Sequence, residues 1–276
     1  DAMPTWLENV VDNRACPTAA ITPESVKAAY IKEEDAFTRA GIEYLDPMLH
    51  MDEPALLVRQ LRGAWGDPLG LSAGETRRAV QAAYGALEDL QRRLHDEGRK
   101  VLEQIEQTDR VGVVVLSRPY HADPGISHGI IEELQKLGYP VLTQDCLPID
   151  EPILERLFGE EVAADLCESA LSIDDVWKNS FSENTNRKIW AAKFVARHPN
   201  LVGLELSSFK CGHDAPIYTL IEDIIETSGT PYFCFKDIDE NKPTGSIKIR
   251  IETIGYFLKR YSEQLAERHR NARRIE

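Results

Sequence analysis

An uncharged apolar run that ends in a polar loop is the feature that most limits how this chain can fold. Residues Val111–Leu116 read VGVVVL, which is typical of a strand buried on both faces of a parallel sheet. The polar segment Ser117-Arg118-Pro119-Tyr120-His121 follows, and then a helical pattern over Ile126–Leu137. This order predicts a strand–loop–helix unit, and ligands of open α/β sheets bind in the loops at the carboxyl ends of strands.

Three more short apolar runs repeat the pattern. We expect strands at Pro140–Thr143, Leu201–Leu206 and Tyr232–Phe235, and helices at Glu151–Ala170, Thr185–His198, Ile217–Thr227 and Ser246–Arg270. Four strands separated by helices predict an α/β fold class, with a doubly wound, four-stranded and mainly parallel sheet.

The residues before this alternation predict helices and loops. Thr22-Pro23-Glu24 has the pattern of a helix start and predicts a helix over Pro23–Ala36, and Asp52-Glu53-Pro54 predicts another. Ser72 and Glu75 have the spacing of a capping box that opens a long helix to about Gln107. We therefore expect a helical N-terminal region or cap over 1–108 and a flavodoxin-like or Rossmann-like α/β domain over 109–276.

Composition excludes several classes of protein. The net charge of −14 over 276 residues argues against a nucleic-acid partner. No apolar run approaches the roughly 20 residues that cross a bilayer, and the first residues do not read as a signal peptide. The five cysteines are odd in number, widely spaced and without a CxxC pair, so we expect a reducing cytoplasm and no disulfide framework. The GxxxxGK[ST], GxGxxG and HExxH motifs are missing.

Hydroxyl, thiol, imidazole and carboxylate groups gather in the loops after the predicted strands. Cys211 precedes a predicted helix start, where a lowered thiol pKa suits metal ligation or nucleophilic attack, although a thiol that packs as a small apolar group is the favoured alternative. His121 is interpreted as a base, a ligand or a hydrogen-bonding loop residue. Arg118 would clamp a phosphate or carboxylate, or would bridge to an acidic loop.

The remaining candidates are weaker. Asp237, Asp239 and Glu240 lack the pattern of a calcium loop and favour a solvated turn over a hard-cation site. We interpret three cysteines as packing residues, with Cys146 and Cys234 beside or within strands and Cys167 on a helix.

Four motifs occur together in one order along the chain. They are Cys16-Pro17-Thr18-Ala19, Arg118-Pro119-Tyr120-His121 with Asp123-Pro124, Ser207-Ser208-Phe209-Lys210-Cys211-Gly212-His213-Asp214 and Lys236-Asp237-Ile238-Asp239-Glu240-Asn241. Together they resemble the proteins called acyl-CoA dehydratase activase-related, which are similar to the D-component of 2-hydroxyglutaryl-CoA dehydratase and to benzoyl-CoA reductase subunits.

This resemblance implies an iron–sulfur module of an acyl-CoA dehydratase or reductase system, active only with a partner. An ATP-dependent activase would supply low-potential electrons to a cluster, [4Fe–4S] or related, and an acyl-CoA or other small molecule would be the substrate. The resemblance makes Cys211 the first and Cys16 the second expected cluster and metal ligand. Arg118, His121, Ser207 and Ser208 would be the catalytic or pocket residues. A homodimer is compatible with this interpretation.

Two other functions remain open. The same edge of the sheet would serve a binding or docking module for an acyl-CoA or a nucleotide, without a cluster, in which Arg118 and helix N-termini hold the ligand. A thiol enzyme would use Cys211 as nucleophile, with His121 or His213 as base.

Overall fold

The chain folds into two compact units that are joined by a long helix. The computed structural model describes residues 3–8, 10, 13–208, 211–238 and 244–275. Unit 1 comprises residues 1–6, 10–90 and 179–183, and unit 2 comprises residues 7–9, 91–178 and 184–276. Helix α4 (Ala73–Gln107) contributes its first half to unit 1 and its second half to unit 2.

Unit 2 contains a parallel sheet built from the four predicted apolar runs. Its described strands are β1 (Gly112–Leu116), β2 (Val141–Thr143), β3 (Leu201–Leu206) and β4 (Tyr232–Phe235), in the order β2-β1-β3-β4. All pairs are parallel, and Leu116 at the end of β1 pairs with Glu205 near the end of β3. This parallel sheet confirms the predicted α/β fold class. Its strands are apolar throughout, and such strands require a sheet that is covered on both faces.

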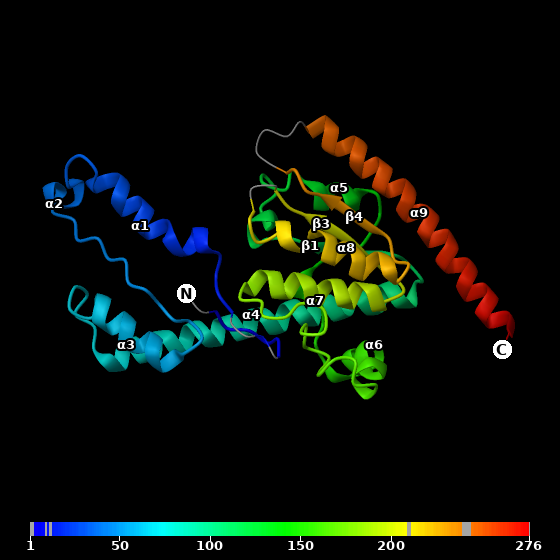
Figure 1. Cartoon of the computed structure of the whole chain (residues 1–276), viewed down its shortest axis with the longest axis horizontal. Coiled ribbons are helices and arrows are strands. Elements are labelled where there is room, and N and C mark those ends of the chain that lie inside the picture. Colours follow the sequence, from blue (N-terminus) through cyan, green and yellow to red (C-terminus); the bar gives the residue numbers. More distant parts are fainter. Residues whose placement is uncertain (1–2, 9, 11–12, 209–210, 239–243, 276) are drawn as a thin grey trace. The chain divides into compact units, whose positions relative to one another are not determined.

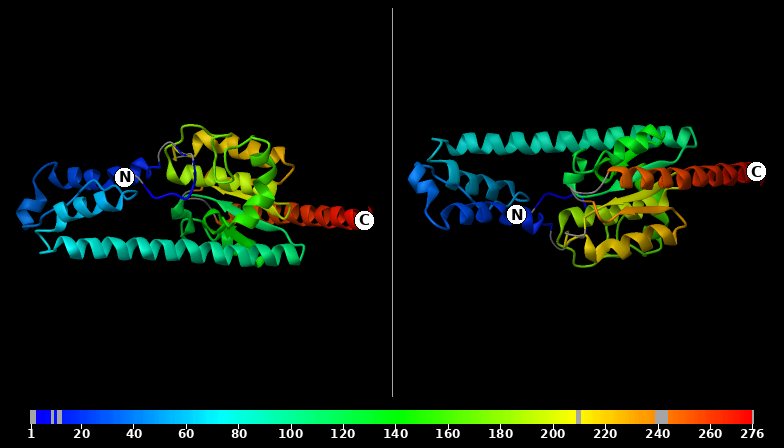
Figure 2. Two further views of the ribbon diagram at one scale, coloured as in Figure 1. Left: turned by 90° about the horizontal axis from the view of Figure 1, so that it is seen from below. Right: turned by 90° about the horizontal axis from the view of Figure 1, so that it is seen from above.

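Helices cover both faces of this sheet. One face packs against α5 (Ile130–Lys136) and α9 (Thr244–Ile275) in a cluster that includes Val113, Val115, Val202, Leu204, Ile251 and Leu258. On the other face, glycines in the strands let the side chains of two helices approach. A Cβ on Gly112 would lie 2.5 Å from Ile105 of α4, and one on Gly203 would lie 2.7 Å from Ile225 of α8 (Tyr218–Thr227). Figure 2 shows α9 and α8 on opposite sides of the sheet.

The other connections complete unit 2 (Figure 1). Helix α5 links β1 to β2, while α6 (Glu151–Ala163) and α7 (Glu183–Arg197) lie between β2 and β3. Short 3-10 turns follow three strands, at Pro119–Ala122, Gln144–Cys146 and Ala215–Ile217. The predicted helix Glu151–Ala170 is too long, since α6 ends at Ala163 and Cys167 lies beyond it.

The described part of unit 1 is helical, as predicted, but its first helix begins earlier than expected. Helix α1 spans Pro17–Ile31, with Cys16 at its N-cap and Pro23 inside it. The Thr22 hydroxyl donates to the Thr18 carbonyl one turn back, at 2.7 Å, and so does not cap a helix at Pro23. Helices α2 (Ala36–Ala40) and α3 (Pro54–Trp65) follow.

Helix α4 begins at the predicted capping box. The Ser72 backbone N–H donates to Glu75 Oε2 at 2.8 Å, and the Glu75 N–H donates to Ser72 Oγ at 3.2 Å. Helix α4 ends at Gln107, next to the predicted domain boundary after residue 108. The division of the chain into two domains at this boundary stays a prediction. Among the described residues, no helix has the length and apolarity required to traverse a bilayer.

Candidate functional site

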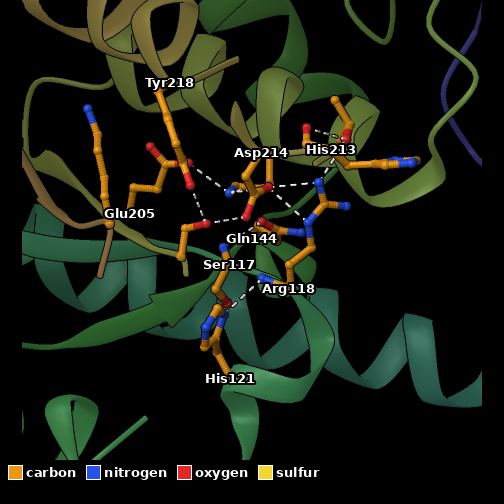
Figure 3. A network of polar contacts seen from close by, with 12 residues as sticks. Ser117, Arg118, His121, Gln144, Glu205, His213, Asp214 and Tyr218 are labelled. Carbon is orange, nitrogen blue, oxygen red and sulfur yellow. Dashed lines mark hydrogen bonds and ion pairs between the residues drawn. The ribbon is translucent and has the colours of Figure 1, made fainter. Parts of the chain in front are cut away.

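The carboxyl ends of β1 and β3 lie side by side at the point where the strand order reverses. From β1 the chain crosses to β2 on one side, and β3 lies on the other side. Ser117 and Arg118 follow β1, Ser207 follows β3, and Gln144 follows β2. Such a topological switch point is where open α/β sheets hold their ligands. Figure 3 shows the polar network found there.

Arg118 is buried and joins three segments of unit 2. Its Nε donates to Asp214 Oδ1 at 2.8 Å, and its Nη2 lies 2.7 Å from the same oxygen. Nη2 also donates to Thr185 Oγ1 of α7 at 3.0 Å. Of the two open predictions for Arg118, the structure shows the ion pair with an acidic loop residue.

Lys188 of α7 lies between two buried carboxylates. Its Nζ donates to Glu205 Oε1 at 2.8 Å and to Asp214 Oδ1 at 3.0 Å, and all three side chains are 0% exposed. Tyr232 of β4 donates its hydroxyl to the other oxygen of Glu205. Burial, and then the charge of Glu205, raise the pKa of Tyr232, so this phenol stays protonated.

Asp214 is the centre of the network, because it accepts hydrogen bonds at both oxygens. Its Oδ1 faces Arg118 and Lys188, and its Oδ2 accepts from Ser207 Oγ. Ser207 Oγ also lies 2.8 Å from the Tyr218 hydroxyl. Burial alone would raise the pKa of Asp214, but the charges of Lys188 and Arg118 outweigh it and hold the pKa below its ordinary value. Asp214 is therefore a fixed carboxylate at neutral pH.

His121 supports the loop after β1. Its Nδ1 accepts the Arg118 backbone N–H at 3.3 Å, and its own backbone N–H donates to the Arg118 carbonyl at 2.9 Å. Burial, and then the positive charge of Lys188, lower the pKa of His121 to about 4. The ring is therefore neutral at pH 7, and its proton is on Nε2.

Gln144 has a buried donor that the described residues do not satisfy. Its Oε1 accepts the Ser117 backbone N–H at 3.1 Å, which fixes the orientation of the amide. The side chain is 3% exposed, and its Nε2 has no hydrogen-bond partner among the described residues. Figure 3 places Gln144 next to Ser117 and Arg118. An orphaned buried amide costs about 1–3 kcal/mol, so its place at a switch point indicates a ligand or an ordered water.

Tyr120, Ser208 and Cys211 lie in the loops after β1 and β3 and are less buried than the charged residues of the network. Tyr120 is 45% exposed, while Ser208 and Cys211 are half-buried. Burial, and then the nearby Cys211, raise the pKa of Tyr120 to about 12. The Cys211 backbone N–H donates to the Ser208 carbonyl at 3.0 Å. Phe209 and Lys210 lie outside the described residues.

The structure thus brings together most residues that the sequence singled out in the strand-end loops. Arg118, Ser207 and Asp214 are members of the network. His121 contacts it through the backbone N–H of Arg118. The catalytic roles of Arg118, His121, Ser207 and Ser208 stay predictions.

Sequence reasoning missed several members of the network, namely Thr185, Lys188, Glu205, Tyr218 and Tyr232. Glu205 offered a signal, because it is the only charged residue in the apolar run LVGLEL. A buried glutamate in a central strand requires a cation, but its sequence does not show which lysine or arginine supplies it.

The described residues provide no set of ligands for the expected iron–sulfur cluster. Among the described residues, no group of three or more His, Cys, Asp or Glu side chains is placed to hold a metal ion. Cys16 lies in unit 1 and Cys211 in unit 2. The described residues therefore do not fit the expected iron–sulfur cluster, and its presence stays a prediction.

The structure also places the other cysteines and part of the last predicted loop. All five cysteines are in the described residues and none forms a disulfide. Cys167 is buried, while Cys146 and Cys234 are half-buried. Asp237 pairs with Arg250 of α9 at 2.8 Å. Asp239, Glu240 and Asn241 lie outside the described residues.

Fold and site together define a doubly wound α/β protein with a buried polar network at its switch point. Residues 3–147, more than half of the chain, match the family described as the CoA enzyme activase uncharacterised domain. The chain belongs to this family. Searches of curated proteins and of solved structures gave no match.

The family match corrects the function expected from the sequence. We expected an iron–sulfur module that receives electrons from a separate activase. This expectation is wrong, because the matched family is itself that of a CoA enzyme activase domain. The resemblance to activase-related proteins is confirmed at this coarser level, whereas the specific likeness to a dehydratase D-component or a benzoyl-CoA reductase subunit is not.

Proposed function

We propose that this chain is a ligand-binding part of the activase of a CoA-dependent enzyme, and that it binds CoA or an acyl-CoA at the switch point between β1 and β3. The family match supports an activase role next to a CoA-dependent enzyme. One observation carries the choice of site, which is the buried and unpartnered Nε2 of Gln144 beside Arg118.

The donors at this point suit a ligand rich in acceptor oxygens. Gln144 Nε2 offers two N–H groups. Arg118 uses Nε and Nη2 on Asp214 and Thr185, and its third nitrogen, Nη1, has no hydrogen-bond partner among the described residues. CoA carries amide carbonyls and phosphates, and an acyl-CoA adds a thioester carbonyl, so both present such oxygens. The ligand would enter past Tyr120, Ser208 and Cys211.

The network gives this site a fixed geometry. Asp214 and Thr185 hold the guanidinium of Arg118 from two sides, and Ser117 holds the amide of Gln144. Donors fixed in this way need little reorganisation when an acceptor arrives, which favours binding.

Isothermal titration with CoA tests this proposal. Gln144→Glu keeps the acceptor for the Ser117 N–H and replaces only the unpartnered donor with an oxygen. We expect the unchanged protein to bind CoA and the Q144E variant to bind it at least about tenfold more weakly, as expected when a buried donor is lost and an acceptor faces the ligand.

The matched control is Gln135→Glu, the same substitution at an exposed position of α5. This variant should bind CoA as the unchanged protein does. Failure of the unchanged protein to bind CoA, or equal binding by the Q144E variant, would refute the proposal.

A further inference from the structure

We infer that the group held by Gln144 and Arg118 is a neutral carbonyl oxygen, of the amide or thioester kind, and not a phosphate or carboxylate. This inference rests on the proposed function, because it names which end of a CoA ligand occupies the site. It follows from the charges of the network, from the contacts of Arg118 and from the neutral state of the neighbouring rings.

The network is electrically balanced without a ligand. Its described cations are Arg118 and Lys188, and its described carboxylates are Asp214 and Glu205. Each cation lies within 3.0 Å of a carboxylate oxygen, and these four side chains are at most 5% exposed. No positive charge among them is left over to compensate a buried anion.

Asp214 already occupies the guanidinium in the way that an anionic ligand would. Both Nε and Nη2 of Arg118 approach Asp214 Oδ1, at 2.8 and 2.7 Å. A phosphate that sought the same two nitrogens would have to displace Asp214 or lie against its charge. Only Nη1 is left, and one N–H edge suits a single acceptor oxygen better than a bidentate anion.

The neighbouring imidazoles and the Tyr120 phenol add no positive charge at neutral pH. Burial lowers the pKa of His121 to about 4, and burial together with the charge of Arg118 lowers the pKa of His213. Tyr120 is neutral as well, since its pKa is raised to about 12. The faces that surround Gln144 and Arg118 in the described residues therefore present neutral donors and paired charges.

Desolvation then decides between the two kinds of ligand group. An ion that leaves water for a protein interior loses several kcal/mol unless an opposite charge compensates it. A carbonyl needs only one or two donors, and Gln144 Nε2 and Arg118 Nη1 supply them. In CoA, carbonyls of this kind lie in the pantetheine arm, while the charge lies in the phosphates of the adenosine end.

Competition by the two halves of CoA tests the inference. The probes are pantetheine, which is neutral, and adenosine 3′,5′-bisphosphate, each titrated into the full chain alone and against bound CoA. We expect pantetheine to bind and to displace CoA, with less than a twofold change between 50 and 300 mM salt. Its binding should weaken at least tenfold in Q144E and remain unchanged in Q135E.

The outcomes separate this inference from the proposed function. Binding of CoA with displacement by adenosine 3′,5′-bisphosphate that depends on Gln144, and no displacement by pantetheine, would overturn the inference and leave the proposed function standing. Binding of pantetheine that depends on Gln144, without binding of intact CoA, would support the inference and refute the proposed function. If the chain binds neither half, the inference is overturned.

Discussion

The Lys188 ammonium is buried between two carboxylates, so its removal tests the network directly. Replacing Lys188 with Met removes contacts of 2.8 Å to Glu205 and 3.0 Å to Asp214. Asp214 keeps Arg118 and Ser207, but Glu205 keeps only the neutral hydroxyl of Tyr232 among the described residues. Leaving one buried charge uncompensated costs about 3–5 kcal/mol, and we expect K188M to lose this much of the free energy of unfolding.

Urea denaturation followed by tryptophan fluorescence measures the loss. Trp177 and Trp190 belong to unit 2, and a Trp6→Phe, Trp65→Phe background removes the tryptophans of unit 1, so that the signal reports on the unit that contains Lys188. The double variant K188M/E205Q should recover most of the lost stability, because the uncompensated charge is gone.

The control is Lys248→Met, the same substitution at an exposed position of α9, which should change the free energy of unfolding by no more than about 0.5 kcal/mol. A loss below about 1 kcal/mol in K188M, or an equal loss in K188M/E205Q, would contradict the account of a buried charge balance.

Two further predictions concern single residues. The pKa of His121 is lowered to about 4, so the unfolded chain binds a proton that the folded chain does not, and stability should fall as the pH drops from about 6.5 to 4. Over this window the free energy of unfolding of H121N, measured by urea denaturation, should fall less steeply than that of the unchanged protein, by up to about 1.4 kcal/mol per pH unit. Equal slopes for the two proteins would refute the role of His121. In α4, a Cβ on Gly98 would lie 1.6 Å from the Cys146 carbonyl oxygen, while one on Gly85 would meet nothing within 4 Å. Thermal unfolding should therefore show Gly98→Ala destabilised by about 1–3 kcal/mol and Gly85→Ala stabilised by about 0.5–1 kcal/mol, and equal effects would contradict the close packing of α4 on Cys146.

Local sequence was sufficient for much of the α/β part. The strands Leu201–Leu206 and Tyr232–Phe235 have the predicted bounds, because short apolar runs between turn residues have few other ways to bury themselves. The capping box of Ser72 and Glu75 was also readable, since both of its hydrogen bonds join residues three positions apart. The start of α1 could not be predicted from local sequence, because the Thr22 hydroxyl donates back to the Thr18 carbonyl and Pro23 is accommodated within the helix.

The sequence by itself determined the class of fold and which loops would meet at the carboxyl edge, because alternating strands and helices imply parallel strands, and parallel strands have their carboxyl ends at one edge of the sheet. Only the tertiary structure decided which partners the charged residues in those loops have. The sequence left Arg118 open between a clamp for an anion and a bridge to an acidic loop, and the fold pairs it with Asp214, 96 residues away. Lys188 joins this pair to Glu205 because α7 crosses the sheet at that point. Charge pairing in a protein interior depends on distances of about 3 Å between residues that are remote in the chain, and sequence patterns do not contain those distances.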